Sequence, residues 1–137
     1  MSAEVFVDTN VVLYAVSGDP TEASKARRAR HILANEDFGL SAQVIQEFFV
    51  NATRKIAVPL TDEQALEFIE ILAQAPVVPI DLDLVFDAVA YKTRLGLSYW
   101  DAAIVAAAHA LGAKLLYTED FAHGQLYGDV RAVNPFR

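Results

Sequence analysis

The stretch VFVDTN, Val5–Asn10, decides how the rest of the chain can be interpreted. Val5–Val7 is a short apolar run, typical of a strand that is covered on both faces of a sheet. It ends on the carboxylate of Asp8, followed by a hydroxyl and an amide. Where strands and helices alternate, ligands and reacting groups collect at the carboxyl ends of parallel strands. An Asp at such a junction also commonly caps the next helix, so these six residues leave both interpretations open.

Apolar runs and helical stripes alternate along the whole chain. Strands are predicted at residues 5–7, 38–40, 77–78, 114–117 and 130–133, and helices at residues 11–16, 19–35, 41–52, 61–72, 83–95 and 102–111. This alternation predicts an α/β fold with a mainly parallel sheet and right-handed crossovers. Prolines flank the strand at 77–78, which places it at an edge of the sheet.

Three predicted helices begin with a capping-box pattern, in which a polar cap is followed three residues later by an acid or an amide. The pairs are Asp19 with Glu22, Thr61 with Gln64, and Ser98 with Asp101. For Asp101 the pattern supplies a purely structural interpretation, because a carboxylate in the first turn also gains from the helix dipole. A functional interpretation of Asp101 therefore needs support from other acids.

Three further carboxylates supply that support. If the first and fourth strands are neighbours, Asp8 and Asp120 lie side by side at their carboxyl ends. Asp101 begins the most apolar helix and is expected at the same edge. Glu47 lies beside the apolar stripe of the helix at 41–52 and can reach inward, although such a Glu is usually a surface residue. The sequence thus predicts four carboxylates around one small volume.

A cluster of carboxylates needs a counter-ion. Two like charges ~4 Å apart repel by about 4 kcal/mol at an effective dielectric constant near 20. The cluster must therefore be partly protonated or hold a cation. Oxygen ligands without His or Cys favour magnesium or manganese over zinc. Such ions activate water and hold a scissile phosphate, so the acids predict a metal site that acts on a phosphate.

The overall charge works against nucleic-acid binding. The net charge is −7 and the pI is near 4.8, so the field of the whole protein does not attract nucleic acid. Any nucleic-acid chemistry must rely on metal ions and local basic patches. Lys25–Arg30 contains four of the eleven basic residues, and Arg27 and Arg28 are candidate RNA-binding residues. A solvated helix face is the favoured interpretation of this segment.

The sequence also predicts the cellular location of the protein. It contains no cysteine, which excludes a thiolate metal site and a cysteine nucleophile. It begins without a recognisable signal peptide, and its longest apolar run is far too short to span a bilayer. A soluble, cytoplasmic domain with no membrane partner is expected.

Four motifs together resemble the PIN domain: VDTN at Asp8, the mid-helix Glu47, WDAAIVAAA at Asp101 and TEDF at Asp120. A chain of this length resembles in particular the VapC-type toxins of toxin–antitoxin pairs. The resemblance covers residues 1–137 as a single PIN-like domain, with all four acidic positions filled in the expected order. It implies a three-layer α/β sandwich around a central parallel sheet of about five strands in the order 3-2-1-4-5.

The resemblance also implies an activity and a set of roles. The activity is endoribonuclease cleavage of RNA phosphodiester bonds, a hydrolase reaction dependent on magnesium or manganese. The catalytic and metal-binding set would be Asp8, Glu47, Asp101 and Asp120, supported by the polar residues Asn10 and Thr118. Toxin members form homodimers and are silenced by a small antitoxin along the acidic groove. The hydrophobic content of 54% fits burial against such partners.

Two other functions are considered. The first is a catalytically inert PIN-fold module that binds RNA or protein, which intact acids do not exclude; a divalent-ion titration separates it from the nuclease. The second is phosphoryl transfer with Asp8 as nucleophile. That chemistry needs a second acid beside Asp8 and a lysine at a later strand end, whereas Asn10 stands there and Lys114 lies at the start of its strand. The second function is disfavoured.

Overall fold

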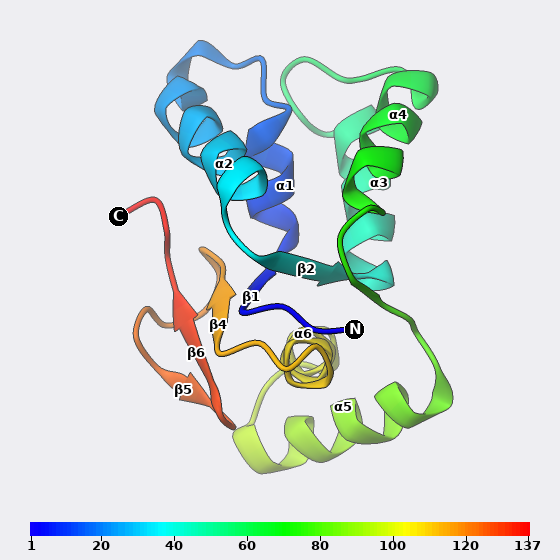
Figure 1. Ribbon diagram of the computed structural model, residues 1–137, viewed down its shortest axis with the longest axis vertical. Helices are drawn as coiled ribbons and strands as arrows, with labels where there is room; N and C mark the ends of the chain where they lie inside the picture. The colour runs from blue at the N-terminus through cyan, green and yellow to red at the C-terminus, as the bar shows by residue number, and fades with distance from the viewer.

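A six-stranded sheet runs through the middle of the molecule (Figure 1). The computed structural model describes all 137 residues. In chain order the elements are β1 (Val5–Val7), α1 (Thr9–Ala15), the 3₁₀ turn η1 (Pro20–Glu22), α2 (Ala23–Asn35), β2 (Phe38–Ser41), α3 (Ala42–Arg54), α4 (Asp62–Leu72), β3 (Val77–Val78), α5 (Leu82–Leu95), α6 (Tyr99–Ala110), β4 (Leu115–Tyr117), β5 (Leu126–Tyr127) and β6 (Val130–Val133).

The strand order is β3-β2-β1-β4-β6-β5. The five predicted strands are present and parallel, in the predicted order, with β3 at one edge. The additional strand β5 was not predicted; it forms an antiparallel hairpin with β6. Gly128, at φ 64°, takes the first position of the two-residue loop between Tyr127 and Val130. A left-handed first residue is what a type II′ hairpin loop requires, which makes glycine suitable there.

Helices cover both faces of the sheet. Figure 1 shows α1–α4 on one side, and α5 and α6 on the other. In α6 every residue from Ala102 to Ala108 is buried, as its nearly uniform apolar sequence predicts. Gly39 of β2 is needed for close approach to the end of α6, since a Cβ there would lie 2.8 Å from Leu111 and 2.9 Å from the Pro76 carbonyl oxygen. No helix is both long and apolar enough to cross a membrane.

The helix starts partly follow the predicted caps. At α4 the capping box is confirmed, because Thr61 and Gln64 bond to each other's backbone N–H groups. The box predicted for Asp19 and Glu22 is wrong. The hydroxyl of Ser17 donates to the Glu22 carboxylate at 2.6 Å and accepts from the Asp19 N–H at 3.2 Å. These are the two groups that would bond to each other in the box, so the direct bond between them is absent. The turn η1 forms there, and α2 begins only at Ala23.

Candidate functional site

The carboxyl ends of β1 and β4 meet at the centre of the sheet. Val7 and Tyr117 are paired in register, and the N–H of Asp8 donates to the Tyr117 carbonyl at 3.0 Å. This pairing brings Asp8 beside Thr118, whose hydroxyl donates to Asp8 Oδ2 at 2.8 Å. The other carboxylate oxygen accepts from the Thr9 N–H at 2.8 Å. Asp8 therefore caps α1 and also stands at the strand end, so the two interpretations of its position are compatible.

The Asp8 carboxylate is buried, with 6% of the residue exposed. Burial raises its pKa from 3.8 to about 6, because the charged form loses hydration. The hydrogen bonds from Thr9 and Thr118 act in the opposite direction, and the charges of Asp120 and Glu47 raise the pKa further. Asp8 thus ionises less readily than an exposed acid, chiefly because it is buried and to a smaller extent because Asp120 and Glu47 are nearby.

Each residue of the triplet Asp8-Thr9-Asn10 is linked to the acidic cluster. Asp8 supplies a carboxylate itself, the Thr9 hydroxyl donates to Glu47 at 3.0 Å, and the Asn10 amide donates to Asp120 at 3.1 Å. The N–H of Asp120 in turn donates to Thr118 Oγ1 at 3.0 Å. Acids from β1, α3 and the segment after β4 are therefore held around the first turn of α1. Sequence reasoning missed Thr9, although its place inside the motif was a usable signal.

Asp101 lies at the first turn of α6 and is half-buried. Its N–H donates to Ser98 Oγ at 3.1 Å, but its carboxylate accepts no hydrogen bond. The capping-box interpretation of this acid is therefore wrong for its side chain. Gln43, one turn before Glu47 on α3, donates to the Trp100 carbonyl at 3.4 Å. This bond holds the start of α6 close to α3. No hydrogen bond links Asp101 to the other three acids.

The donor set suits a hard cation only if water completes the coordination. Nowhere in the structure do three or more acidic or histidine side chains form a group that could hold a metal ion. Magnesium, however, is usually bound through one or two carboxylates, several waters and substrate phosphates. Asn10 Oδ1 is buried without a hydrogen-bond partner and adds one oxygen ligand beside Asp120. The residues present fit such a partly hydrated ion.

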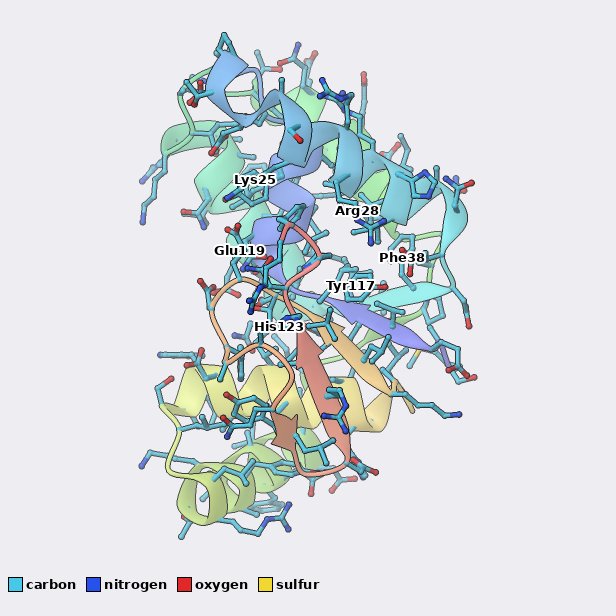
Figure 2. All side chains as sticks on the ribbon, turned by 90° about the vertical axis from the view of Figure 1, so that its left-hand side faces the viewer. Lys25, Arg28, Phe38, Tyr117, Glu119 and His123 are labelled. Atoms are coloured by element: carbon cyan, nitrogen blue, oxygen red, sulfur yellow. The ribbon has the colours of Figure 1, made fainter.

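Glu119 lies next to Asp120 in the chain, but its carboxylate belongs to a separate network. Tyr14 donates to it at 2.6 Å and Lys25 at 2.7 Å. Figure 2 shows the Lys25 and Glu119 side chains on neighbouring elements. Burial and the Glu119 carboxylate raise the pKa of Tyr14. Sequence reasoning left Glu119 unassigned, because its partners lie 94 and 105 residues away and no local pattern connects them.

The two candidate RNA-binding arginines are placed differently. Arg28 is half-buried, and its Nε donates to the Pro135 carbonyl at 3.2 Å. Its Nη1 lies 3.6 Å from Glu36. Arg27 is exposed and lines a different hollow, together with residues 17–20 of the preceding loop. The basic helix α2 thus presents its charges on two sides.

Fold and site together define a mainly parallel α/β domain with acidic side chains at the carboxyl ends of its central strands, β1 and β4. We call the surface formed by Asp8, Glu47 and Asp120 the acidic edge. The chain belongs to the PIN domain family, whose model matches residues 5–128. No curated protein matches the sequence.

Solved structures with the same fold include three from bacterial toxin–antitoxin studies. A toxin–antitoxin complex from Klebsiella pneumoniae is 24% identical, with a TM-score of 0.68 and coverage of 96% of this chain and 97% of that one. VapC20 of Mycobacterium tuberculosis, a sarcin–ricin loop cleaving toxin, is 20% identical, with a TM-score of 0.65 and coverage of 85% and 89%. VapBC2 of Rickettsia felis, bound to a promoter DNA fragment, is 18% identical, with a TM-score of 0.64 and coverage of 93% and 96%.

Proposed function

We propose that this protein is an endoribonuclease that uses magnesium or manganese to hydrolyse RNA phosphodiester bonds. The observation that carries the proposal is the triplet Asp8-Thr9-Asn10, which gathers Glu47 and Asp120 around a buried carboxylate at the sheet edge. Acids whose pKa is raised by burial and by neighbouring carboxylates cluster at functional sites, which supports the proposal. The fold shared with VapC20, a toxin that cleaves an RNA loop, supports the same class of activity.

The roles of the residues follow from their positions. We expect Asp8, Glu47, Asp101 and Asp120 to contact the ion, some directly and the others through its bound waters, and a bound ion would supply a Lewis acid and an activated water. Thr118 and Thr9 fix the orientation of Asp8, so that its oxygens stay at the strand end. Asn10 keeps Asp120 at the edge and offers its own free oxygen to the ion or to a bound water.

The biological role proposed is that of the toxin in a toxin–antitoxin pair, acting in the cytoplasm. The similar solved structures include toxin–antitoxin complexes, and the full-length coverage makes the comparison one of whole chains. A small antitoxin protein is the expected partner, bound along the acidic groove so that RNA has no access to the carboxylates. Co-purification of this chain with the protein encoded beside it, followed by loss of cleavage in the complex, tests this role.

Self-association is proposed through α5. Leu82, Phe86 and Val89 recur at helical spacing and are 66%, 62% and 49% exposed. Contiguous apolar surface of this kind is uncommon on a monomeric protein. Phe86→Glu should convert a dimer to a monomer in sedimentation velocity. Ile71→Glu, at a comparably exposed position of α4 (60%), should leave the dimer intact. A wild-type monomer at all concentrations would contradict the proposal.

The central experiment incubates the purified chain with a mixed panel of RNAs, in magnesium, in manganese and in a chelator. An Asp8→Asn preparation is treated identically. Cleavage that requires the metal and disappears in Asp8→Asn is the expected result. Cleavage that survives the substitution would come from a contaminating nuclease. If no RNA is cut, calorimetric titration with manganese decides, since an inert RNA- or protein-binding module should bind no divalent ion.

A further inference from the structure

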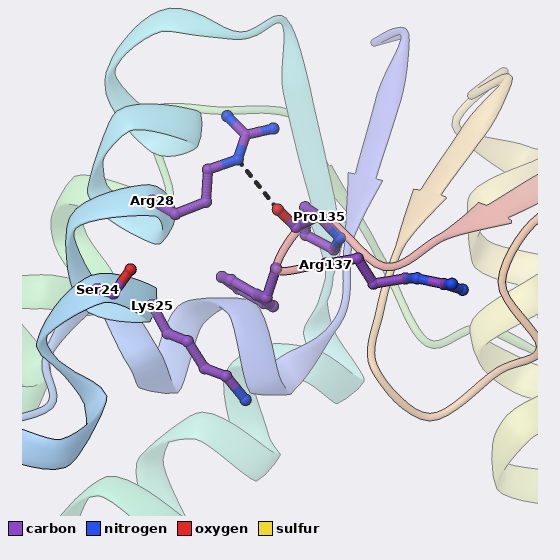
Figure 3. Close-up of a pocket in the computed structure, with 6 residues that line it drawn as sticks. Ser24, Lys25, Arg28, Pro135 and Arg137 are labelled. Atoms are coloured by element: carbon purple, nitrogen blue, oxygen red, sulfur yellow. Dashed lines mark hydrogen bonds between the residues drawn. The ribbon is translucent and has the colours of Figure 1, made fainter.

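A hollow of about 280 Å³ lies between α2 and the C-terminal segment. It is lined by Ser24, Lys25, Arg28, Pro135, Phe136 and Arg137, three of which are cationic and none acidic. Figure 3 shows these side chains around Pro135. In a protein of net charge −7, a lining with three cations and no acid stands out. Two of these cations have acidic partners outside the lining, Lys25 with Glu119 and Arg28 with Glu36, whereas Arg137 has no ion-pair partner.

The hollow is held in shape by packing on both sides. Arg28 bonds to the Pro135 carbonyl and so fixes the C-terminal segment on α2. The Phe136 ring packs edge-on against Tyr14, with centroids 4.9 Å apart. The Lys25 ammonium lies 4.9 Å from the Tyr14 ring centroid and 6.0 Å from that of Phe136. The walls are thus tied to α1, the helix that carries Asn10 of the acidic site.

Lys25 also connects the hollow to the carboxylates. Its ammonium is bound to Glu119, which directly precedes Asp120 in the chain. Consecutive Cα atoms lie ~3.8 Å apart, so Glu119 connects one wall of the hollow to the residue beside the proposed site of the scissile phosphate.

The cationic groups keep donors available for a ligand. Arg28 donates from Nε to Pro135, and its Nη1 lies 3.6 Å from Glu36, so the N–H donors of Nη2 remain for a ligand. The Lys25 and Arg28 side chains are 41% and 39% exposed, and Arg137 makes no hydrogen bond or ion pair. Figure 3 shows the Arg28 and Arg137 guanidiniums extending to different sides of Pro135. Groups that diverge in this way suit successive charges along a chain better than one small anion.

We propose that this hollow binds the phosphate backbone of the RNA substrate next to the cleavage site, through Arg28 and Arg137, with Lys25 at the side nearest the carboxylates. This inference rests on the proposed ribonuclease function, but it concerns binding rather than cleavage. RNA fits better than an acidic peptide, because its phosphates can also share the cations held by the neighbouring carboxylates. The half-buried Phe136 ring lines the hollow and adds an apolar surface against which a ribose or base can pack.

The test measures binding of a labelled single-stranded RNA by fluorescence anisotropy over a range of salt concentrations. All proteins carry Asp8→Asn, so that no RNA is cut, and magnesium is present. Adding Arg137→Gln should weaken binding roughly three- to tenfold and reduce the slope of log K against log salt by about 0.7. Arg94→Gln, which removes the same charge from an exposed position of α5 on the other side of the sheet, should change neither quantity.

A second pair of variants controls for the structure of the hollow. Arg28→Gln should also reduce the slope, whereas Arg28→Lys keeps the charge and should retain it, even though the bond to Pro135 is lost. Equal effects of Arg94→Gln and Arg137→Gln would overturn the proposal, as would no effect of Arg137→Gln or no RNA binding at the lowest salt. An effect of Arg137→Gln on polyglutamate binding alone would identify a protein-binding surface and would also overturn it. Absence of both cleavage and manganese binding in the wild-type chain would contradict the nuclease function without touching these binding results.

Discussion

The Thr118 hydroxyl, directly after β4, donates a 2.8 Å hydrogen bond to Oδ2 of Asp8, directly after β1, and accepts the N–H of Asp120 at 3.0 Å. A single hydroxyl therefore joins two acids that are 112 positions apart in the sequence. Because it both donates and accepts, no apolar residue of similar shape can replace it. The geometry of the acidic edge depends on this bridge.

Thr118→Val keeps the shape of the side chain and removes the bridge. We expect a loss of about 1–3 kcal/mol in the free energy of unfolding, since a buried carboxylate oxygen and a backbone N–H both lose their partner. The loss should appear in thermal melts at pH 7. Thr53→Val is the matched control, because the Thr53 hydroxyl only donates to a carbonyl one turn back in α3. Equal melting shifts for the two variants would contradict the importance of the bridge.

Asp8→Asn should make the protein more stable at neutral pH. The native pKa of about 6 lies above the ordinary value of 3.8 for an Asp, so the native state binds more protons between these values and stability falls as pH rises through that window. This shift in pKa means that the ionised Asp8 destabilises the wild type by about 3 kcal/mol at pH 7, a cost that the variant avoids. The variant loses one hydrogen bond, which costs roughly 1 kcal/mol. A gain of about 1–2 kcal/mol is expected at pH 7 in chelator.

Thermal melts of the wild type and Asp8→Asn at pH 4, 5, 6 and 7 check this. The advantage of the variant should be absent near pH 4, where Asp8 is protonated in the native state, and should grow up to about pH 7. A variant that is less stable than the wild type at pH 7 would show that the hydrogen bonds to the Asp8 carboxylate outweigh its desolvation.

Metal affinity should depend on pH through the same carboxylate. Only the ionised form of Asp8 can bind a divalent ion, so protons and metal compete for it. With a pKa of about 6, the apparent affinity for manganese should fall about tenfold between pH 7 and pH 5. Calorimetric titrations at these two values measure the change. An affinity that stays constant would mean that Asp8 is not a ligand.

Asp101→Asn should abolish cleavage at little cost in stability. The carboxylate accepts no hydrogen bond, and Ser98 caps α6 in its place, so only the interaction with the helix dipole is lost, about 0.3–1 kcal/mol. Ser98→Ala is the comparison: it removes the cap, at about 1 kcal/mol, and leaves all four acids in place. Cleavage assays and melts of both variants separate the roles. Full activity in Asp101→Asn would remove this residue from the catalytic set.

Some features of this protein were determined by the sequence alone, because they depend on neighbours a few residues apart. The apolar run Val5–Val7, the uniformly apolar segment of α6 and the Thr61–Gln64 box each specify their element locally. The α/β alternation then follows, and with right-handed crossovers it restricts the sheet to few strand orders. Two local patterns were misjudged: Ser17 displaced the box at Asp19 and Glu22, and β5, which is defined by its antiparallel pairing with β6, was not recognised.

The tertiary structure decided which polar groups meet. Three contacts join residues that are 38, 94 and 107 positions apart: the bond from Thr9 to Glu47, the pair of Lys25 and Glu119, and the bond from Arg28 to the C-terminal segment. Side-chain contacts over such separations depend on strand register and helix packing, which sequence periodicity does not specify to the accuracy of a hydrogen bond. The types of group at the acidic edge were thus readable from the sequence. Their partners and the pKa of Asp8 were set by the burial and contacts that folding creates.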